Sequence, residues 1–352
     1  MPKDNLFVPR IIHIDITGKC NFECLHCRGR FSNKSIELSH FKRIIDNIFE
    51  NWNNDLKWME IGGGEPLLHK DLAKMIHYIK KKNKKIRIIV VSNGSLFNEK
   101  KAKELKSAGI TRIQFSLDGV NAETHNWLRQ NDSSFRKVMD AIEIAKKDNI
   151  DFVLRMTINN KNLNQIEDFF KLGKEKGAVE LGLRGCIYVG NAEENTSELY
   201  LDKETYSKIL VHLPLWSKKY NMPYFSGDPL ALVANKELIE QIEKKFGSLD
   251  HYSGCSVGIS YMYINNDGNV SFCPMLNNIE IAKLESRDIK DVWDNCLEFI
   301  HMRKRDMGGK CGKCKFLKLC GGCCAYGYWK EKKLFAENPI CCFFVNKNMM
   351  EV

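Results

Sequence analysis

The sequence lacks any apolar run approaching the roughly 20 residues that a membrane-spanning helix requires. Residues 1–10 also lack the basic head and apolar stretch of a secretory signal. A chain without either feature is expected in the cytoplasm, where thiols stay reduced. We therefore expect a cytoplasmic protein with no membrane span, whose cysteines do not form a disulfide framework.

Basic residues interleaved with aromatic ones, a mark of nucleic-acid-binding segments, are also missing. The formal net charge is nevertheless +10. The densest basic run, residues 80–87, is interpreted as solvated surface between a helix and a strand. The remaining positive charge suits an acidic substrate or an acidic redox partner, and we expect no nucleic acid.

Cysteine, by contrast, is abundant. The chain has 14 cysteines, most of them in its last hundred residues. Clustered cysteines in a reducing compartment indicate metal ligands. The C-terminal hundred residues are also rich in glycine and show little apolar periodicity, so we expect bound metal to stabilise them.

Short apolar runs alternate with amphipathic stretches over the first half of the chain. The expected strands are Ile11–Ile16, Lys57–Ile61, Ile86–Val91, Arg112–Leu117, Phe152–Ile158 and Val179–Ile187. The expected helices are Leu38–Glu50, Leu72–Lys81, Glu99–Ser107, Phe135–Lys147 and Leu163–Lys174. This alternation predicts an α/β fold, an incomplete (β/α)6 barrel with a parallel sheet.

Three domains follow from this pattern. We predict the partial barrel at 1–200 and a helical bridge at 201–250, with helices Lys203–Lys219 and Ala231–Phe246. A cysteine-rich domain follows at 251–352. In parallel barrels the chemistry lies at the carboxyl ends of the strands, so motifs at those positions are the candidates for a site.

The first such motif follows the first strand and contains Cys20, Cys24 and Cys27. Three thiolates at these spacings can hold one face of a four-iron cluster and leave the fourth iron open to a ligand. A fourth protein ligand would remove that vacancy. A zinc site and three unrelated core cysteines are the alternatives for this loop.

Three further motifs follow the next strands in order. They are Gly62–Gly63–Gly64–Glu65–Pro66, Ser92–Asn93–Gly94 and Ser116–Leu117–Asp118–Gly119. The glycines permit close approach of the backbone to a ligand, and strand-end carbonyls with Glu65 can accept hydrogen bonds from an ammonium group.

Cysteines and motifs in this order resemble the radical S-adenosylmethionine (SAM) superfamily. The resemblance implies a [4Fe–4S] cluster that binds SAM. It implies that the segment 62–66 holds the SAM amino group, that Ser92 and Asn93 contact the ribose, and that Ser116 with Arg129 or Arg155 binds the carboxylate. His26 occupies a position that often supports the adenine through its backbone. A surface ion pair is the alternative role for Arg129.

The C-terminal cysteines resemble the SPASM extension of peptide-modifying radical SAM enzymes. That resemblance implies one or two auxiliary [4Fe–4S] clusters. Cys255 and Cys273 would join Cys324 or Cys323 on the first of them. The ligands implied for the second are Cys311, Cys314, Cys320 and Cys341.

Two departures from this pattern matter. No cysteine lies in 256–261, where many SPASM enzymes have one, so an open iron or a non-cysteine ligand remains possible for the first auxiliary cluster. The adjacent pairs Cys323–Cys324 and Cys341–Cys342 leave the ligand register open, and we prefer Cys341. A zinc ribbon is disfavoured because only five residues separate Cys314 from Cys320.

Two cysteines are left over. Cys296 is expected in the core of a helix, and Cys186 at the end of the sixth strand could face the cavity. The other candidate cavity residues at strand ends are Glu60, Gln114, Arg155, Arg184 and Tyr188.

The resemblance implies reductive cleavage of SAM to a 5′-deoxyadenosyl radical and hydrogen abstraction from the substrate, with ferredoxin or flavodoxin as electron donor. We expect a ribosomal peptide or protein as substrate, ahead of oxidative decarboxylation of a tetrapyrrole such as a haem precursor. The cluster loop begins too early for the leader-binding domain that many peptide-modifying relatives carry. A non-catalytic iron–sulfur scaffold or redox sensor is the alternative of another class, and no catalytic acid or base can be named.

Overall fold

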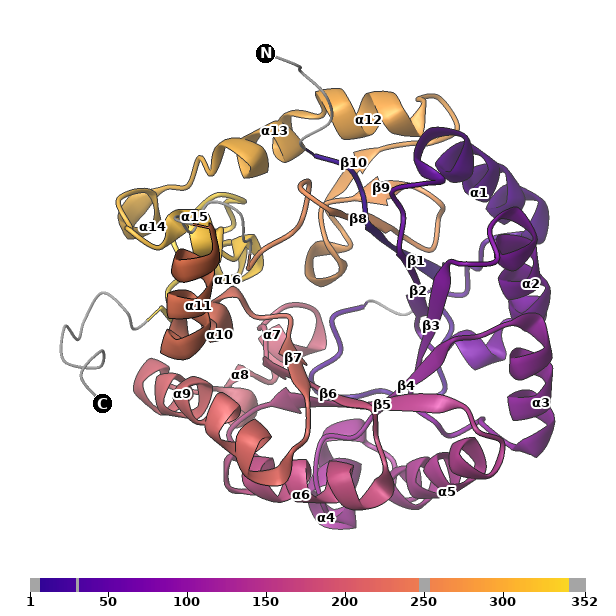
Figure 1. Ribbon diagram of the computed structural model, residues 1–352, viewed down its shortest axis with the longest axis horizontal. Coiled ribbons are helices and arrows are strands. Elements are labelled where there is room, and N and C mark those ends of the chain that lie inside the picture. Colours follow the sequence, from indigo (N-terminus) through magenta and orange to yellow (C-terminus); the bar gives the residue numbers. More distant parts are fainter. Residues whose placement is uncertain (1–6, 30–31, 247–253, 342–352) are drawn as a thin grey trace.

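The computed structural model describes residues 7–29, 32–246 and 254–341. Its centre is a ten-stranded sheet surrounded by helices (Figure 1). The order across the sheet is β10–β9–β8–β1–β2–β3–β4–β5–β6–β7, and all strands from β8 to β7 run parallel. The strands are β1 Ile11–Thr17, β2 Trp58–Gly63, β3 Arg87–Ser92, β4 Arg112–Ser116, β5 Asp151–Ile158, β6 Glu180–Gly185, β7 Tyr224–Ser226, β8 Tyr261–Ile264, β9 Val270–Ser271 and β10 Glu280–Ala282.

Helices connect the strands and cover the outside of the barrel. In the barrel half they are α1 Leu38–Trp52, α2 Leu72–Lys82, α3 Glu99–Ala108, α4 Ala122–Arg129, α5 Ser134–Lys147, α6 Ile166–Lys176, α7 Asn191–Glu194, α8 Thr196–Leu199 and α9 Lys203–Tyr220. The later helices are α10 Pro229–Ala234, α11 Lys236–Phe246, α12 Ile289–Asn295, α13 Leu297–Lys304, α14 Gly309–Gly312, α15 Leu317–Cys320 and α16 Cys324–Glu331. Within the described ranges, no helix combines the length and apolarity of a membrane crossing.

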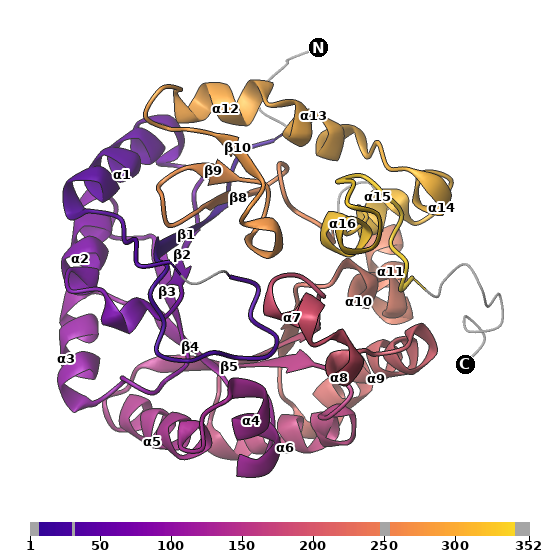
Figure 2. The same cartoon turned by 180° about the vertical axis from the view of Figure 1, so that it is seen from behind.

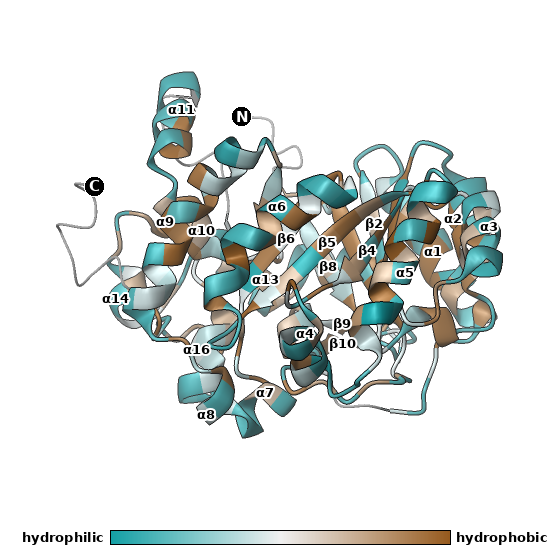
Figure 3. Ribbon diagram, turned by 90° about the horizontal axis from the view of Figure 1, so that it is seen from below, coloured by the Kyte–Doolittle hydropathy of each residue, from teal (hydrophilic) through white to brown (hydrophobic). Residues whose placement is uncertain are grey.

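Alternation along the strands gives the barrel an apolar outside and a polar inside. In β1, Ile12, Ile14 and Ile16 are fully buried in the main hydrophobic core, which they share with residues of α1 and α2. His13 and Asp15 point to the opposite face because side chains alternate along a strand. In Figure 3 the strands are largely hydrophobic, while the outer surfaces of α1, α3 and α5 are hydrophilic. The inside of the barrel is therefore free to carry chemistry.

Side-chain caps set where several helices begin. Asn98 accepts a hydrogen bond from the Lys101 amide at the start of α3, and Asn121 accepts one from the Thr124 amide at the start of α4. Such caps satisfy amides that have no partner within the helix. The α4 cap lies just after β4, so it fixes the direction in which the chain leaves the end of that strand.

The predicted α/β fold with a parallel sheet is confirmed. All six expected strands are present to within two residues, and the five expected helices of the barrel to within three. The expected helix Ala231–Phe246 is wrong, because the chain breaks at Asn235 into α10 and α11. The Asn235 side chain accepts a hydrogen bond from the Leu238 amide, which starts a second helix.

Two parallel strands extend the predicted barrel. β7 pairs with β6, and β8, from the cysteine-rich part of the chain, pairs with β1. In the second pair Ile11 faces Tyr261 and Ile14 faces Ile264. The sheet is open, with β7 at one edge and the antiparallel pair β9–β10, attached to β8, at the other. The C-terminal part is thus built into the barrel through β8.

Candidate functional site

The loop after β1 crosses the open end of the barrel, bordered by α7 (Figure 2). It carries Cys20, Cys24 and Cys27. Burial as the main cause, and neighbouring thiols of the loop as a smaller one, raise the pKa of Cys20 to about 12 and that of Cys24 to about 11. The three thiols therefore lie close to one another, and all are free of disulfides.

Three cysteines on one short loop are the ligand set that a four-iron cluster with one open iron requires. The structure thus keeps the predicted ligands on a single segment at the end of the barrel. Bound iron would also displace the thiol protons that burial retains, since thiolates are the ligands.

A buried ion pair lies directly behind Cys24. Arg129, at the end of α4, bonds the Asp118 carboxylate through Nε at 2.7 Å and lies 3.8 Å from the Cys24 sulfur through Nη1. Although burial opposes ionisation, the guanidinium holds the pKa of Asp118 below its usual range. The alternative of a surface ion pair for Arg129 is wrong, because both partners are buried. The pair places a positive charge beside a thiolate ligand.

The glycine segment after β2 holds the cysteine loop by close backbone contact. Gly64 and Glu65 donate their amides to the carbonyls of Thr17 and Lys19, each at 2.8 Å. A Cβ at Gly63 would lie 2.2 Å from the Thr17 carbonyl, and the φ of Gly63 is +130°. Only glycine is tolerated there. These glycines thus allow the backbone of the cysteine loop to pack directly against the end of β2.

Glu65 ties two further strand ends together. Its carboxylate accepts hydrogen bonds from the Leu67 amide, the Ser92 hydroxyl and the Asn93 amide at 2.8–3.0 Å. The Asn93 side chain donates to Asn21 of the cysteine loop at 3.0 Å. The predicted residues of the second and third motifs therefore form one network with the first.

Glu65 should make stability depend on pH. Burial raises its pKa from 4.5 to about 7 despite three hydrogen bonds. Below about pH 4 the folded and unfolded states both hold the proton. Between about pH 4.5 and 7 the unfolded state loses it first, so stability falls with rising pH until the folded state also ionises above about pH 7. We expect the metal-free protein to lose about 3 kcal/mol of stability across this range through this group. Urea unfolding of wild type and Glu65→Gln at several pH values tests this, since the variant should show the smaller slope; parallel slopes would refute it.

A charged network that the sequence did not reveal lines the barrel wall at β1. His13 contacts Asp15 through Nε2 at 2.8 Å and Glu60 through Nδ1 at 3.0 Å. Burial disfavours its charge, but the hydrogen bonds to Asp15 and Glu60 raise the pKa of His13. An imidazole donates from both nitrogens only when protonated, so His13 is an imidazolium here. Alternating polar residues in the run IIHIDIT were the available signal.

Arg28 connects this network to the C-terminal cysteines. It bonds Asp15 through Nη2 at 3.2 Å and the Pro274 carbonyl through Nη1 at 2.7 Å. Tyr263 of β8 donates to the same carboxylate of Asp15. Because Arg28 follows Cys27 and Pro274 follows Cys273, one guanidinium joins two cysteine-bearing loops.

Among the described residues, several polar groups around the barrel interior have no hydrogen-bond partner. Arg155 of β5 forms no side-chain hydrogen bond with any of these residues. Burial and the charge of Arg184 on β6 lower its pKa, and the charge of Glu60 opposes this. Buried polar atoms normally find partners. Those without one include Gln114 Nε2, Arg184 Nε and His26 Nδ1. Burial lowers the pKa of His26 to about 4, so it is neutral. This set of unsatisfied groups fits a polar ligand.

Ser116 and Arg155 are direct neighbours in this interior. They are register partners: Ser116 is the last residue of β4, and Arg155 lies three residues before the end of β5. Arg129, the other candidate partner of Ser116, already contacts Asp118 and Cys24. Arg155 is therefore the cation available next to Ser116.

The C-terminal thiols gather in two neighbouring groups. After burial as the main cause, Cys255 raises the pKa of Cys273, Cys323 and Cys324, and Cys273 and Cys323 raise that of Cys324. In the same way Cys314 raises the pKa of Cys311, and Cys341 raises that of Cys320, which Cys323 of the first group also raises. Cys311 and Cys341 also line one small surface cavity. The alternative ligand Cys342 lies outside the described residues.

The left-over cysteines and Tyr188 lie in packed surroundings. Cys186 and Tyr188 follow the end of β6 and leave the sheet to join a small core with Leu128. Tyr188 packs on Trp329 at 4.6 Å, so its predicted place in the cavity is wrong. Cys296 is buried between α12 and α13, outside either helix.

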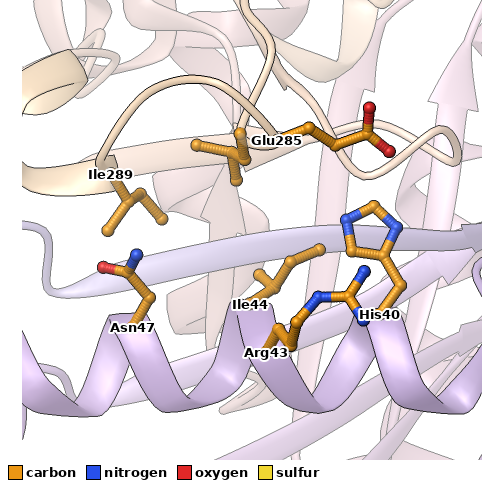
Figure 4. Close-up of a pocket in the computed structure, with 7 residues that line it drawn as sticks. His40, Arg43, Ile44, Asn47, Glu285 and Ile289 are labelled. Atoms are coloured by element: carbon orange, nitrogen blue, oxygen red, sulfur yellow. The ribbon is translucent and has the colours of Figure 1, made fainter.

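A surface pocket lies away from all these groups, between α1 and the segment before α12 (Figure 4). None of the predicted site residues lines it. Its lining consists of His40, Arg43, Ile44, Asn47, Leu284, Glu285 and Ile289.

Comparison with known proteins identifies two matching families. The model of the radical SAM superfamily matches residues 14–173, and that of an iron–sulfur cluster-binding domain, SPASM, matches residues 255–315. Together they span more than half of the chain.

Individual relatives match over nearly their whole length. The chain is 27% identical to an AdoMet-dependent heme synthase of Methanosarcina barkeri, covering 95% of this chain and 97% of the relative. It is 24% identical to the mycofactocin maturase MftC of Mycobacterium ulcerans, covering 96% and 88%. The fold is similar to that of Streptococcus suis SuiB bound to its precursor peptide SuiA, with a TM-score of 0.75 at 17% identity, covering 95% and 76%.

Proposed function

The chain belongs to the radical SAM superfamily and carries a SPASM domain, and on that premise we propose that it oxidises a carboxylate-bearing side chain of a tetrapyrrole. When bound, the N-terminal cluster and SAM supply a 5′-deoxyadenosyl radical that removes a hydrogen atom from an unactivated C–H bond. The protein is therefore an enzyme rather than a scaffold. Its own residues bind and orient the two reactants.

One observation supports the substrate class. Arg155 and Arg184 lie on adjacent strands. Burial and the charge of Arg184 lower the pKa of Arg155, the nearby charge of Glu60 opposes this, and no carboxylate of the described residues forms a salt bridge with Arg155. Two guanidinium groups in a half-buried interior favour anions beside them. The SAM carboxylate would account for one, at Arg155, and a substrate carboxylate for the other, at Arg184; tetrapyrrole precursors carry several carboxylates.

We infer the SAM-binding roles from the contacts among the residues present. We propose that the SAM carboxylate lies against Ser116 and Arg155, and its amino group against the backbone carbonyls of Gly62–Gly64. The loops around this SAM-binding place are held together by hydrogen bonds from Ser92 and Asn93 to Glu65. Pro66 begins the helical turn that follows Glu65. Arg129 positions Cys24. His26, neutral and buried, borders the adenine.

We assign Arg184 to the substrate. Its Nη2 lies 3.8 Å from the Cys323 sulfur, but its Nε has no partner among the described residues, and it stands one strand beyond Arg155. A propionate held there would lose a hydrogen atom from the carbon β to its carboxylate. Loss of CO2 and one electron then leaves a vinyl group. The electron requires a one-electron acceptor of iron–sulfur type, which the C-terminal cysteines can hold.

The electron needed to cleave SAM comes from outside the chain. We propose a reduced ferredoxin or flavodoxin as donor, since both are acidic and the net charge here is +10. We place the enzyme in the cytoplasm, where such donors and reduced thiols occur.

A peptide is the second candidate substrate. The sequence alone puts it first, and similarity to the maturase MftC supports it. We put the tetrapyrrole first because the heme synthase is the more similar relative, and because paired arginines suit a polycarboxylate.

Two arginine variants test these roles. Arg155→Gln should raise the KM for SAM about 10–100-fold, since a charge-assisted hydrogen bond contributes about 1.5–3 kcal/mol. Arg184→Gln should leave SAM cleavage without substrate unchanged and slow turnover of iron coproporphyrin III by a similar factor. Mass spectrometry would detect a product lighter by one CO2 and two hydrogens.

Arg87→Gln is the matched control, because Arg87 lies at the opposite end of the barrel, over Trp58. This variant should change neither the KM for SAM nor the turnover of iron coproporphyrin III. If the reconstituted enzyme forms 5′-deoxyadenosine but alters no tetrapyrrole, while an acidic peptide is modified, the substrate assignment fails and the enzyme class stands.

A further inference from the structure

The first auxiliary cluster is short of one cysteine, and the chain has one to spare nearby. The segment 256–261, where a further ligand was expected, contains none. Cys323 and Cys324 are adjacent, although only one of them is needed to complete a set of three with Cys255 and Cys273. Both are buried, with exposed fractions of 5% and 2%. Cys324 also contacts the Met302 sulfur at 3.6 Å, so a ligand role for the pair depends on which other thiols lie beside it.

Backbone contacts bring Cys255 against the turn that carries this pair. The Cys255 amide donates to the Cys320 carbonyl at 2.8 Å, and the Gly254 amide donates to Leu319 at 2.7 Å. Arg305 then bonds the Cys255 carbonyl at 3.2 Å and the Gly321 carbonyl at 3.5 Å. These bonds fix the Cys255 backbone to the two residues just before Gly322 and Cys323.

The pKa effects agree with this placement. Burial is the largest cause for each thiol. Beyond it, Cys255 and Cys323 both raise the pKa of Cys324, and Cys273 does so as well. Cys255 also raises the pKa of Cys323. All four thiols therefore share one location.

Two cations face this group. Arg184 lies 3.8 Å from the Cys323 sulfur through Nη2, and both Arg184 and Arg305 lower the pKa of Cys255. The Asp228 carboxylate opposes them and raises the pKa of Cys255 and of Cys323. The two guanidinium groups outnumber this carboxylate, so the surroundings of the four thiols favour thiolates and a negatively charged cluster. A guanidinium group is attracted to a thiolate more strongly than to an uncharged thiol, so the contact of Arg184 with Cys323 favours a thiolate at that position.

We propose that Cys323 and Cys324 both bind the first auxiliary cluster, so that it is closed by Cys255, Cys273, Cys323 and Cys324. No iron of this cluster is then open to substrate. The cluster transfers electrons, and the substrate is held by side chains of the barrel. Cys323 takes the place of the ligand missing from 256–261. This inference does not depend on which substrate the enzyme uses.

The test uses the full chain in a background without the N-terminal cluster, Cys20→Ala/Cys24→Ala/Cys27→Ala, reconstituted anaerobically. This background should bind about 8 irons in two clusters. Cyanide, a small ligand for open iron sites, should leave the EPR spectrum of the reduced protein unchanged. Adding Cys323→Ala should either make the spectrum respond to cyanide or remove about 4 irons.

Cys296→Ala is the matched control, since Cys296 is a buried cysteine outside both groups, and it should change nothing. If the Cys323→Ala protein loses iron, Cys323→Ser decides the reason, because a serine oxygen can bind iron. Recovery of iron with a shifted EPR signal supports the proposal. A cyanide response already present in the background overturns it. So does a Cys323→Ala or Cys323→Ser protein with full iron and an unaltered spectrum.

Discussion

Replacing Cys24 with alanine should reduce 5′-deoxyadenosine formation by at least about 1,000-fold, the scale seen when a reaction loses a group it cannot do without. Cys24 is one of three thiols on the loop after β1, and an incomplete set cannot retain the cluster there. About 4 of about 12 irons should be lost with it. Product assay by chromatography and iron analysis measure the two effects.

Cys296→Ala is again the control for removing a buried sulfur. It should keep the full iron content and activity, because Cys296 contacts Glu298 and the helical core rather than another cysteine. The C-terminal iron should persist in Cys24→Ala, since those ligands lie on other segments. A Cys24→Ala protein that still forms 5′-deoxyadenosine at the wild-type rate would remove the basis of the proposed chemistry.

Replacing Arg129 with methionine should destabilise the fold by about 3–5 kcal/mol, because it leaves the Asp118 carboxylate buried without its counter-charge. Asp118 is fully buried. It also accepts a hydrogen bond from the Thr157 amide at 2.7 Å, and its backbone amide donates to His125. The ends of β4 and β5 thus meet at this carboxylate. Urea unfolding of the metal-free protein measures the loss.

A double variant separates charge from packing. Asp118→Asn combined with Arg129→Met should recover part of the loss, since no unpaired charge remains in the interior. Lys147→Met, which breaks an exposed pair with Glu99, should have little effect. Equal effects of Arg129→Met and Lys147→Met would show that the buried pair adds nothing to stability.

The sequence predicted the barrel strands well because each has an apolar outer face and is followed by an amphipathic helix. It did not predict β7 or β8. β7 has three residues, too few for a periodic pattern. β8 lies among glycines and cysteines, and it becomes a barrel strand only by pairing with β1. α4 was missed because it is short and polar, with His125 and Arg129 buried by tertiary contacts.

The thiols of the site were predictable because cluster ligands follow fixed spacings along the chain. The charged interior was not. His13, Asp15 and Arg28 meet only through the curvature of the sheet and through contact with Tyr263, 248 residues from Asp15. Glu65 was identified, but its hydrogen bonds to neighbouring loops depend on where β3 ends. Arg129 was likewise identified without its buried partner Asp118 being assigned a role.

The pairing of β1 with β8 has a consequence for synthesis of the protein. Ile11 pairs with Tyr261, which is synthesised much later. At about 5–20 residues per second, the first strand leaves the ribosome roughly 12–50 seconds before its neighbour. During that interval one side of β1 presents unpaired amides and carbonyls, which can recruit a strand from another nascent chain. Rapid overproduction should therefore favour inclusion bodies, and slower translation should raise the yield of native protein.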